Sequence, residues 1–267
     1  MMHTNRAAAR THWQVTRSVW MALFLREALG RVTATRLAWF WILVEPLMHV
    51  ILLVMVRELL GKIRLVTNAE FIPWLLVGIT AFMLFRDGVT RSIGAIDANK
   101  GLFNYRQIKP IDPVLMRTVL EGLLKSLVFI ILLGGALLLG FDILPFEPLG
   151  AILVWLSVWL LGASLGLVVS VVTTLVEEAG RIIKMLIFPL YFLSGAMFPL
   201  QILPHYIQQY VLYNPIAHGL ESIRLQFFEG YHTLDGISLL YLYYWIFAAA
   251  ALGLALHVKF ASRLRAL

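Results

Sequence analysis

The sequence contains no cysteine, and only 14 % of its 267 residues are charged. The lack of cysteine excludes a disulfide framework and any metal site with cysteine ligands. In soluble domains about 25 % of residues are charged and about 45–50 % are apolar, whereas 60 % of the residues are hydrophobic here. This composition excludes intrinsic disorder and almost any ordinary soluble enzyme.

The motifs of common catalytic sites are also missing. The phosphate-binding pattern G-x-x-x-x-G-K-[ST] does not occur, since Gly61 and Lys62 are followed by Ile63. There is no H-E-x-x-H pair and no G-x-S-x-G elbow, and the seven histidines are scattered. We therefore expect no catalytic residue, no metal and no cofactor on this chain, and no ATP binding through a phosphate loop.

The hydrophobic residues are gathered in long runs, and the stretch from Leu149 to Val176 has no Asp, Glu, Lys or Arg. A helix needs ~20 apolar residues to cross a hydrocarbon core about 30 Å thick, and it satisfies its own backbone hydrogen bonds. The runs are too long for the strands of a membrane β-barrel, which have roughly 10 residues of alternating polarity. We predict an all-α integral membrane protein with six transmembrane helices. They are Leu37–Val56, Phe71–Ile93, Val114–Leu139, Leu149–Val176, Met185–Pro204 and Gly236–Val258.

The positive charges predict the orientation of these spans. Of the 22 Lys and Arg residues, 17 fall on the side that holds the N-terminus, four fall on the opposite side, and Lys125 lies within a span. Because lysine and arginine are retained in the cytoplasm, both termini are predicted to be cytoplasmic. The net charge of +7 then needs no nucleic-acid partner.

The same pattern divides the chain into three parts. Residues 1–36 form a cytoplasmic N-terminus with an interfacial amphipathic helix, residues 37–258 form the transmembrane domain, and residues 259–267 form a cytoplasmic tail. We read no cleaved signal peptide, because the short apolar run before Arg26 and Glu27 is not followed by a small-residue cleavage site.

Several short motifs follow one another in a characteristic order. F-L-R-E begins at Phe24, W-x-L-x-E-P at Trp41, L-S-G-x-x-F-P at Leu193, Y-N-P at Tyr213 and E-x-I-R at Glu221. Together they resemble the six-span membrane subunits of ABC-2-type exporters, over nearly the whole chain. The segment 177–184 and the basic first cytoplasmic loop are most similar to capsular polysaccharide export permeases of Gram-negative bacteria.

The resemblance implies partners and a function that the composition does not show. Such permeases are homodimers bound to two separate ATP-binding-cassette ATPase subunits, which carry the ATP and Mg²⁺. A periplasmic co-polymerase and an outer-membrane export channel complete the pathway. The expected function is export of an anionic, lipid-linked capsular polysaccharide across the inner membrane. Export of O-antigen, teichoic acid or a small lipophilic compound is the alternative within this class.

Two other classes are less consistent with the sequence. A membrane-bound enzyme of lipid or glycan metabolism needs His, Asp or Glu clustered at one membrane face, and no such cluster is found. A secondary carrier usually has repeated halves with broken helices at matching positions. Here the broken region is confined to the last third of the chain.

The resemblance assigns the cytoplasmic connection 97–113 to coupling with the ATPase, as a plug and polar clamp. The alternative is a basic loop held against anionic lipid. A second, weaker contact is expected just before the fifth span. The coupling candidates are Phe103, Asn104, Tyr105, Ile108, Lys109, Glu178 and Arg181.

Cations and aromatic rings within the spans are candidates for the substrate pathway. Positive charge attracts an anionic glycolipid, although snorkelling to lipid headgroups explains it equally well. Lys125 also lies four residues after Glu121, a spacing that favours an intrahelical ion pair. Glu45 is expected to cap the backbone freed by Pro46 or to pair with a neighbouring helix, with contact to the substrate as the alternative. The pathway candidates are Arg86, Arg91, Lys125, Phe82, Phe85, Tyr191 and Phe192.

Most other aromatic residues, Trp74 among them, are assigned to the interfacial belts near the span ends. The external segment 204–235 is long and apolar, and prolines interrupt it. We predict two short re-entrant helices there, 204–212 and 216–228, which form an external gate; the alternative is a simple amphipathic cap. The gate candidates are Ser194, Gly195, Pro199, Asn214, Pro215, Glu221 and Arg224.

Overall fold

The computed structural model describes residues 11–33, 37–59 and 69–266, and all regular structure within them is helical. The long helices are α1 (His12–Thr33), α2 (Ala38–Leu59), α3 (Phe71–Thr90), α4 (Ile111–Leu138), α5 (Pro148–Leu175), α6 (Ala179–Leu193) and α9 (Leu239–Lys259). The shorter ones are η1 (Asp97–Leu102), η2 (Leu200–Ile202), α7 (His205–Val211), α8 (Pro215–Phe227) and α10 (Ala261–Ala266).

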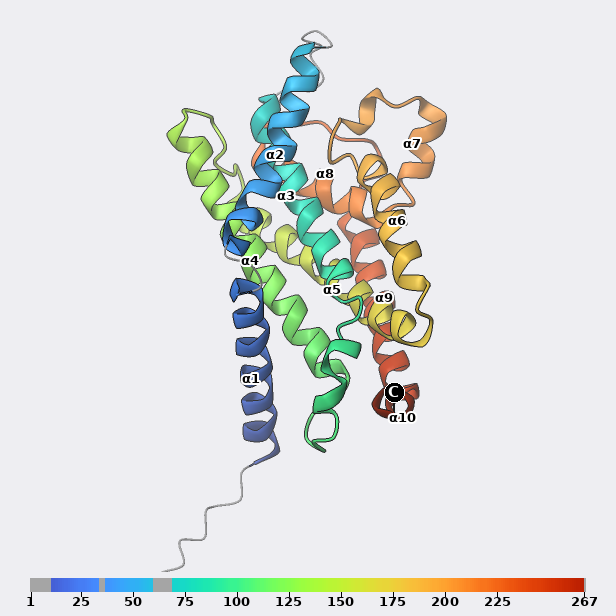
Figure 1. Cartoon of the computed structure of the whole chain (residues 1–267). Coiled ribbons are helices and arrows are strands. Elements are labelled where there is room, and N and C mark those ends of the chain that lie inside the picture. The colour runs from blue at the N-terminus through green and yellow to red at the C-terminus, as the bar shows by residue number, and fades with distance from the viewer. Residues whose placement is uncertain (1–10, 34–36, 60–68, 267) are drawn as a thin grey trace, which may run out of the picture.

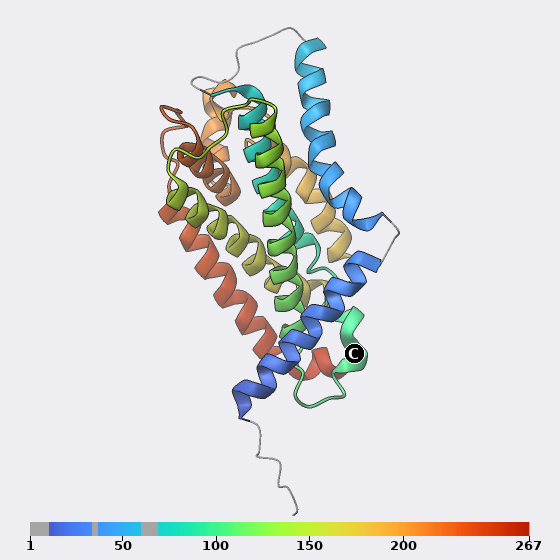
Figure 2. The same cartoon turned by 90° about the vertical axis from the view of Figure 1, so that its left-hand side faces the viewer.

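The helices form an elongated bundle with two distinct ends (Figure 1). α1, η1 and α10 lie at one end, which we call the α1 end, while α7 lies at the opposite end, the α7 end. α1 runs obliquely across α4 (Figure 2), and its Val19 and Leu23 pack against Met116 of α4.

Five of the described helices are long and apolar enough to cross a membrane: Phe40–Leu59, Phe71–Thr90, Ile111–Leu138, Pro148–Leu175 and Leu239–Lys259. They correspond to five of the six predicted spans. The bounds of the remaining one, Met185–Pro204, are wrong. Helix α6 has 15 residues, begins at Ala179 and ends at Leu193. At ~1.5 Å per residue it covers about 22 Å.

Helix α6 ends early for a local reason. Ser194 turns the chain, Gly195 adopts a φ of +74°, and Pro199 stands in extended conformation before η2. A left-handed glycine followed by proline is a typical helix stop. Beyond it, α7 and α8 confirm the prediction of two short helices in the segment 204–235.

Helix α3 is the centre of the bundle. In the apolar stretch of α3 that could cross a membrane, 89 % of the residues are buried, compared with 11 % in the corresponding stretch of α2. It packs against α2, α4, α5, α6 and α8, and α5 in turn packs against α9 (Figure 1). Trp74 lies wholly in this core, so its assignment to an interfacial belt is wrong. The apolar residues of α3 therefore face protein on almost every side, as expected for a helix that is hydrophobic all round.

Glycines allow α3 and α5 to approach each other closely. A Cβ built on Gly162 of α5 would lie 2.8 Å from the carbonyl oxygen of Phe85, and one built on Gly166 would lie 2.7 Å from the carbonyl oxygen of Gly88. Small residues are the usual means by which membrane helices bring their backbones together. The contact between α3 and α5 thus depends on the absence of side chains.

We expect Gly162→Ala to destabilise the protein by about 1–3 kcal/mol, because the new methyl group meets backbone atoms that cannot move aside easily. Gly134→Ala on α4 is the matched control, since a Cβ there has no atom within 4 Å. Alanine is also the better helix former. Thermal unfolding of the purified protein in detergent measures both effects. A melting temperature for Gly162→Ala equal to or above that of Gly134→Ala would contradict the close contact.

Candidate functional site

A neutral cluster of four charged side chains lies among α2, α3 and α4. Arg86 donates a hydrogen bond of 2.7 Å to Glu45 and another of 2.8 Å to Asp87. The Nζ atom of Lys125 lies 2.8 Å from Asp87 and 3.7 Å from Glu45. Asp87 and Lys125 are almost completely buried, whereas the side chain of Glu45 is 39 % exposed. Two cations thus face two anions where an unpaired charge is costly.

This arrangement decides between alternatives that the sequence left open. Glu45 pairs with neighbouring helices through Arg86 and Lys125. The predicted intrahelical pair between Glu121 and Lys125 is wrong. Glu121 instead lies 3.3 Å from Arg31 of α1 and 3.5 Å from Arg91 at the end of α3. Tertiary pairs replace the local one because α1 brings Arg31 across α4.

Asp87 is the residue of this cluster that sequence reasoning missed. It lies next to Arg86 in a span, and a carboxylate in that position signals a buried partner. Its partner Lys125 belongs to another helix, so the pairing follows only from the packing of α3 against α4.

A second buried ion pair lies toward the α7 end, and we call it the α8 latch (Glu221, Arg224, Trp74, Tyr231 and Thr233). Arg224 is fully buried and lies 2.8 Å from Glu221. Its guanidinium donates to the carbonyl oxygens of Gly195 and Ala196 at 2.7 and 3.3 Å and lies 3.5 Å from the centre of the Trp74 ring. The latch therefore ties α8 to α3 and to the turn after α6.

Tyrosine and threonine complete the partners of Glu221. The hydroxyls of Tyr231 and Thr233 donate to Oε2 of Glu221 at 2.9 and 2.6 Å. Burial raises the pKa of Tyr231 to about 12, so its hydroxyl keeps the proton that it donates. Gly78 makes room for the latch, because a Cβ there would lie 1.9 Å from Nη2 of Arg224.

His218 joins α8 to the chain on both sides. Its Nδ1 accepts a hydrogen bond from the Ser238 backbone at 2.9 Å, and its Nε2 lies 2.8 Å from the carbonyl oxygen of Leu212. Burial lowers the pKa of His218. The neutral ring with a proton on Nε2 satisfies both contacts.

Most of the gate candidates meet around this latch. Ser194 is buried and donates to Tyr191, Asn214 caps α8 and donates to Leu193, and Pro215 is the first residue of α8. Gly195 contributes a carbonyl to Arg224. Pro199 follows in the same turn. The structure thus brings the turn at residues 194–199 close to α8. The gate itself stays a prediction.

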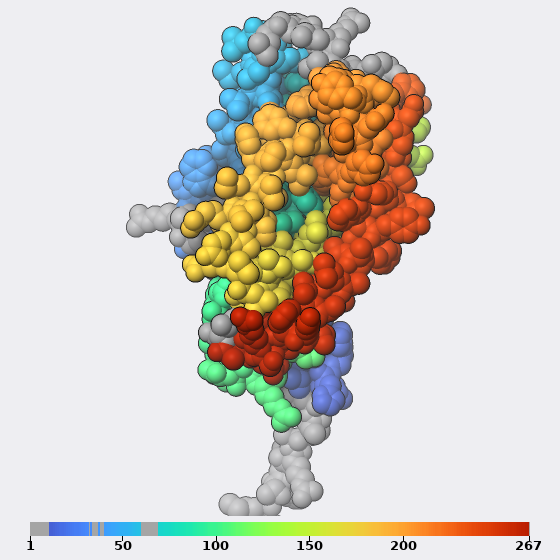
Figure 3. Space-filling model, turned by 90° about the vertical axis from the view of Figure 1, so that its right-hand side faces the viewer, coloured from blue at the N-terminus to red at the C-terminus, as the bar shows by residue number. Residues whose placement is uncertain are grey.

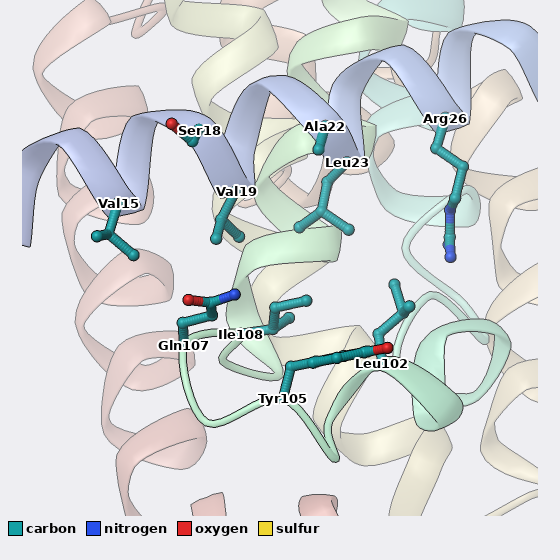
Figure 4. A pocket seen from close by; sticks show the side chains of 10 residues that line it. All are labelled: Val15, Ser18, Val19, Ala22, Leu23, Arg26, Leu102, Tyr105, Gln107 and Ile108. Atoms are coloured by element: carbon teal, nitrogen blue, oxygen red, sulfur yellow. The ribbon is translucent and has the colours of Figure 1, made fainter. Parts of the chain in front are cut away.

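The coupling candidates fall into two groups. Asn104, Tyr105 and Lys109 are exposed and Ile108 is half-buried, whereas Phe103 is buried among residues of α4, α5 and α10. The loop that carries them faces α1 across a cavity of about 470 Å³, which Tyr105, Ile108 and Leu23 help to line (Figure 4). Glu178 and Arg181 are exposed at the start of α6.

The pathway candidates are also divided. Phe82 and Phe85 of α3 are buried in the core of the bundle, while Tyr191 and Phe192 of α6 are half-buried. The ring centroids of Phe82 and Tyr191 are 4.8 Å apart. Arg86 and Lys125 belong to the neutral cluster, and Arg91 pairs with Glu121. α6, which carries Tyr191 and Phe192, lies at the surface beside α9, and atoms of α3 are visible between these two helices (Figure 3).

Apolar helices of spanning length, with charges neutralised between them, define a helical integral membrane protein. The described residues hold no group of three or more His, Cys, Asp or Glu placed to bind a metal. Residues 18–228 match the ABC-2 type transporter family, and the chain belongs to this family.

Three known proteins are similar to this chain over most of their length. The polysialic acid transport protein KpsM of Escherichia coli is 37 % identical over 253 residues, which cover 93 % of this chain and 96 % of the relative. The capsule polysaccharide export inner-membrane proteins CtrC of Neisseria meningitidis serogroup B and BexB of Haemophilus influenzae are each 28 % identical, over 80 % and 78 % of both chains.

We expect Lys125→Met to destabilise the protein by about 3–5 kcal/mol, because Asp87 would stay buried without its closest cation on α4. The double variant Asp87→Asn, Lys125→Met should recover part of this loss. Lys184→Met on the exposed face of α6 is the control. Thermal unfolding in detergent measures all three. A double variant no more stable than Lys125→Met would rule out the proposed dependence on charge pairing.

We expect Arg224→Lys to lower stability by about 1.5–3 kcal/mol, because an ammonium group cannot reach Glu221 and both carbonyls while lying flat on Trp74. Limited proteolysis should then cut more rapidly within residues 194–238. Arg263→Lys, at an exposed position of α10, provides the comparison. Equal cleavage of the two variants would show that the latch does not hold this segment.

Proposed function

We propose that this chain is the permease subunit of an ATP-driven exporter that moves an anionic, lipid-linked capsular polysaccharide across the inner membrane. The observation that carries this proposal is the similarity to KpsM, CtrC and BexB, which runs through most of each chain. The neutral cluster supports it, since charged groups within spans mark the paths of polar substrates.

The proposed topology has six spans, with α6 as the short fifth one and both termini in the cytoplasm. The excess of Lys and Arg on the N-terminal side supports this orientation. The α1 end then faces the cytoplasm. α7 and α8 have only 7 and 13 residues, so they are too short to cross the bilayer, and we propose that they re-enter it from the outside.

A second copy of the chain is proposed to complete the pathway. In one copy, Gly180 is the only buried residue of α6, and α2 is largely exposed. Large apolar side chains such as Met185 and Phe188 stand outward on α6. Contact with another copy would bury these side chains and place Tyr191 and Phe192 of two chains near each other. Their flat rings suit contact with sugar rings.

Energy is proposed to come from a separate ATPase that holds ATP and Mg²⁺, one copy for each permease chain. The exposed residues Asn104, Tyr105 and Lys109 are the proposed contacts, with Glu178 and Arg181 as a second contact. Phe103 is the anchor of the loop, because it belongs to the same buried apolar cluster as Leu167 and Val171 of α5. A push on the loop therefore reaches α5, which packs against α3 and α9.

A periplasmic co-polymerase and an outer-membrane channel are proposed to receive the polymer. Expression of this chain with its ATPase in a capsule-producing strain that lacks its own permease tests the function. Restored surface polysaccharide supports the proposal. Restored export of O-antigen, teichoic acid or a lipophilic compound without capsule would reassign the cargo, and no export of any of them would overturn the proposal.

We expect Tyr105→Ala to reduce export at least tenfold without altering the amount of protein in the membrane, because an exposed aromatic anchor is lost from the contact. Tyr206→Ala is the matched control, since Tyr105 is 60 % exposed and Tyr206, on α7, is 67 % exposed. Surface polysaccharide and ATPase co-purification are both measured. Normal export and normal ATPase binding in Tyr105→Ala would contradict the coupling role.

A further inference from the structure

A basic pocket of about 470 Å³ opens between α1 and the adjoining ends of α3 and α4. Its walls come from both sides of the crossing between α1 and α4 that Figure 2 shows. The lining residues are Arg26, Glu27, Gly30, Arg31, Arg91, Arg117, Leu120 and Glu121.

Positive charge is in excess in this pocket. Four arginines face two glutamates, which leaves two formal positive charges without a carboxylate of their own. Arg117 satisfies Glu27 with hydrogen bonds of 2.9 and 3.1 Å. Glu121 is shared between Arg31 and Arg91, at 3.3 and 3.5 Å.

The shared carboxylate leaves hydrogen-bonding capacity unused. Nε of Arg31 is buried and has no hydrogen-bond partner, although it lies 3.3 Å from Glu121. The side chain of Arg91 is 44 % exposed, so it can turn toward a ligand. Arg26 is 45 % exposed and is held by a hydrogen bond to Asn99 and by Glu27 at 3.7 Å. Guanidinium groups bind phosphate oxygens with paired hydrogen bonds, which suits them to an anion of this kind.

The position of the pocket relative to the candidate spans indicates the source of the anion. Arg91 directly follows a candidate span, and Arg117 and Glu121 lie in the first turns of another. Both helices that cross there also carry exposed apolar side chains, among them Leu25 and Leu29 of α1 and Leu123 of α4. A charged pocket between two such helices, at the ends of spans, is placed at the level where headgroups meet acyl chains.

We propose that this pocket binds the phosphate of an anionic membrane phospholipid, whose acyl chains lie against the apolar side chains of α1 and α4. The arginines compensate the phosphate charge, and the lipid joins α1 to the bundle. This inference needs only that the chain lies in a bilayer, and it does not depend on the exported cargo. Basic pockets between helices at the cytoplasmic face are typical sites for acidic lipid headgroups.

Gly30 offers a variant that leaves every existing ion pair in place. It lines the pocket, and a Cβ there has no atom within 4 Å. Gly30→Glu adds a carboxylate that competes with the phosphate, while Gly30→Gln adds the same volume without charge. A second pair is Arg91→Gln, which removes a lining cation, and Arg17→Gln, which removes an exposed cation of α1 outside the pocket.

Native mass spectrometry of the purified full chain with phosphatidylglycerol or phosphatidylcholine of equal chain length measures binding. We expect phosphatidylglycerol to bind at least fivefold more tightly. Arg91→Gln should weaken its binding about fivefold, which corresponds to about 1 kcal/mol for one basic residue near a membrane surface. Gly30→Glu should weaken it by at least that factor. Gly30→Gln and Arg17→Gln should leave the preference between the two lipids unchanged.

Three results would overturn the proposal. Equal binding of the two lipids would remove the need for an anionic site. An equal loss in Gly30→Gln and Gly30→Glu would show that volume and not charge matters. Displacement of phosphatidylglycerol by millimolar inorganic phosphate or by an acidic oligosaccharide would assign the pocket to a soluble anion or to the cargo. The lipid ratio is compared within each variant, so a loss of folded protein does not mimic the expected result.

Discussion

Charge neutralisation between helices is the constraint on which the rest of the structure depends. A lone charged side chain in hydrocarbon is expensive, and so is a buried charge whose partner is removed. Arg86 and Asp87 pair within α3, whereas Glu45 of α2 and Lys125 of α4 are compensated only when α2, α3 and α4 are packed together. The electrostatic requirement therefore constrains the relative position of these helices.

Helix α3 carries this constraint through the molecule. Asp87 and Arg86 belong to the neutral cluster near one end of the helix, and Trp74 and Gly78 accommodate Arg224 near the other. Directly after the cluster residues, the close approach of Gly88 to Gly162 holds α3 against α5. A movement of α3 would disturb the charge cluster, the latch and the contact with α5 at once. This makes α3 the element that joins the charge cluster, the α8 latch and α5.

Particular residues show how far the sequence led. The five long spans were located because their apolar runs are long enough to cross a bilayer, and the two short helices of the segment 204–235 because prolines interrupt it. The fifth span was misplaced because composition alone does not register that the chain turns at Gly195. Phe103 was assigned to the plug and is buried, which the sequence did not reveal because the apolar faces of α5 and α10 in its cluster are distant in the sequence.

The sequence by itself determined that the chain is a helical membrane protein without its own phosphate loop, since both conclusions follow from local composition and from motifs of fixed spacing. Only the tertiary structure decided which charges are partners. Glu121 pairs with Arg31 and Arg91 and not with Lys125 four residues away, because the crossing of α1 over α4 brings in cations that local spacing cannot reveal. Ion pairing acts over a few ångströms of space, whatever the separation along the chain.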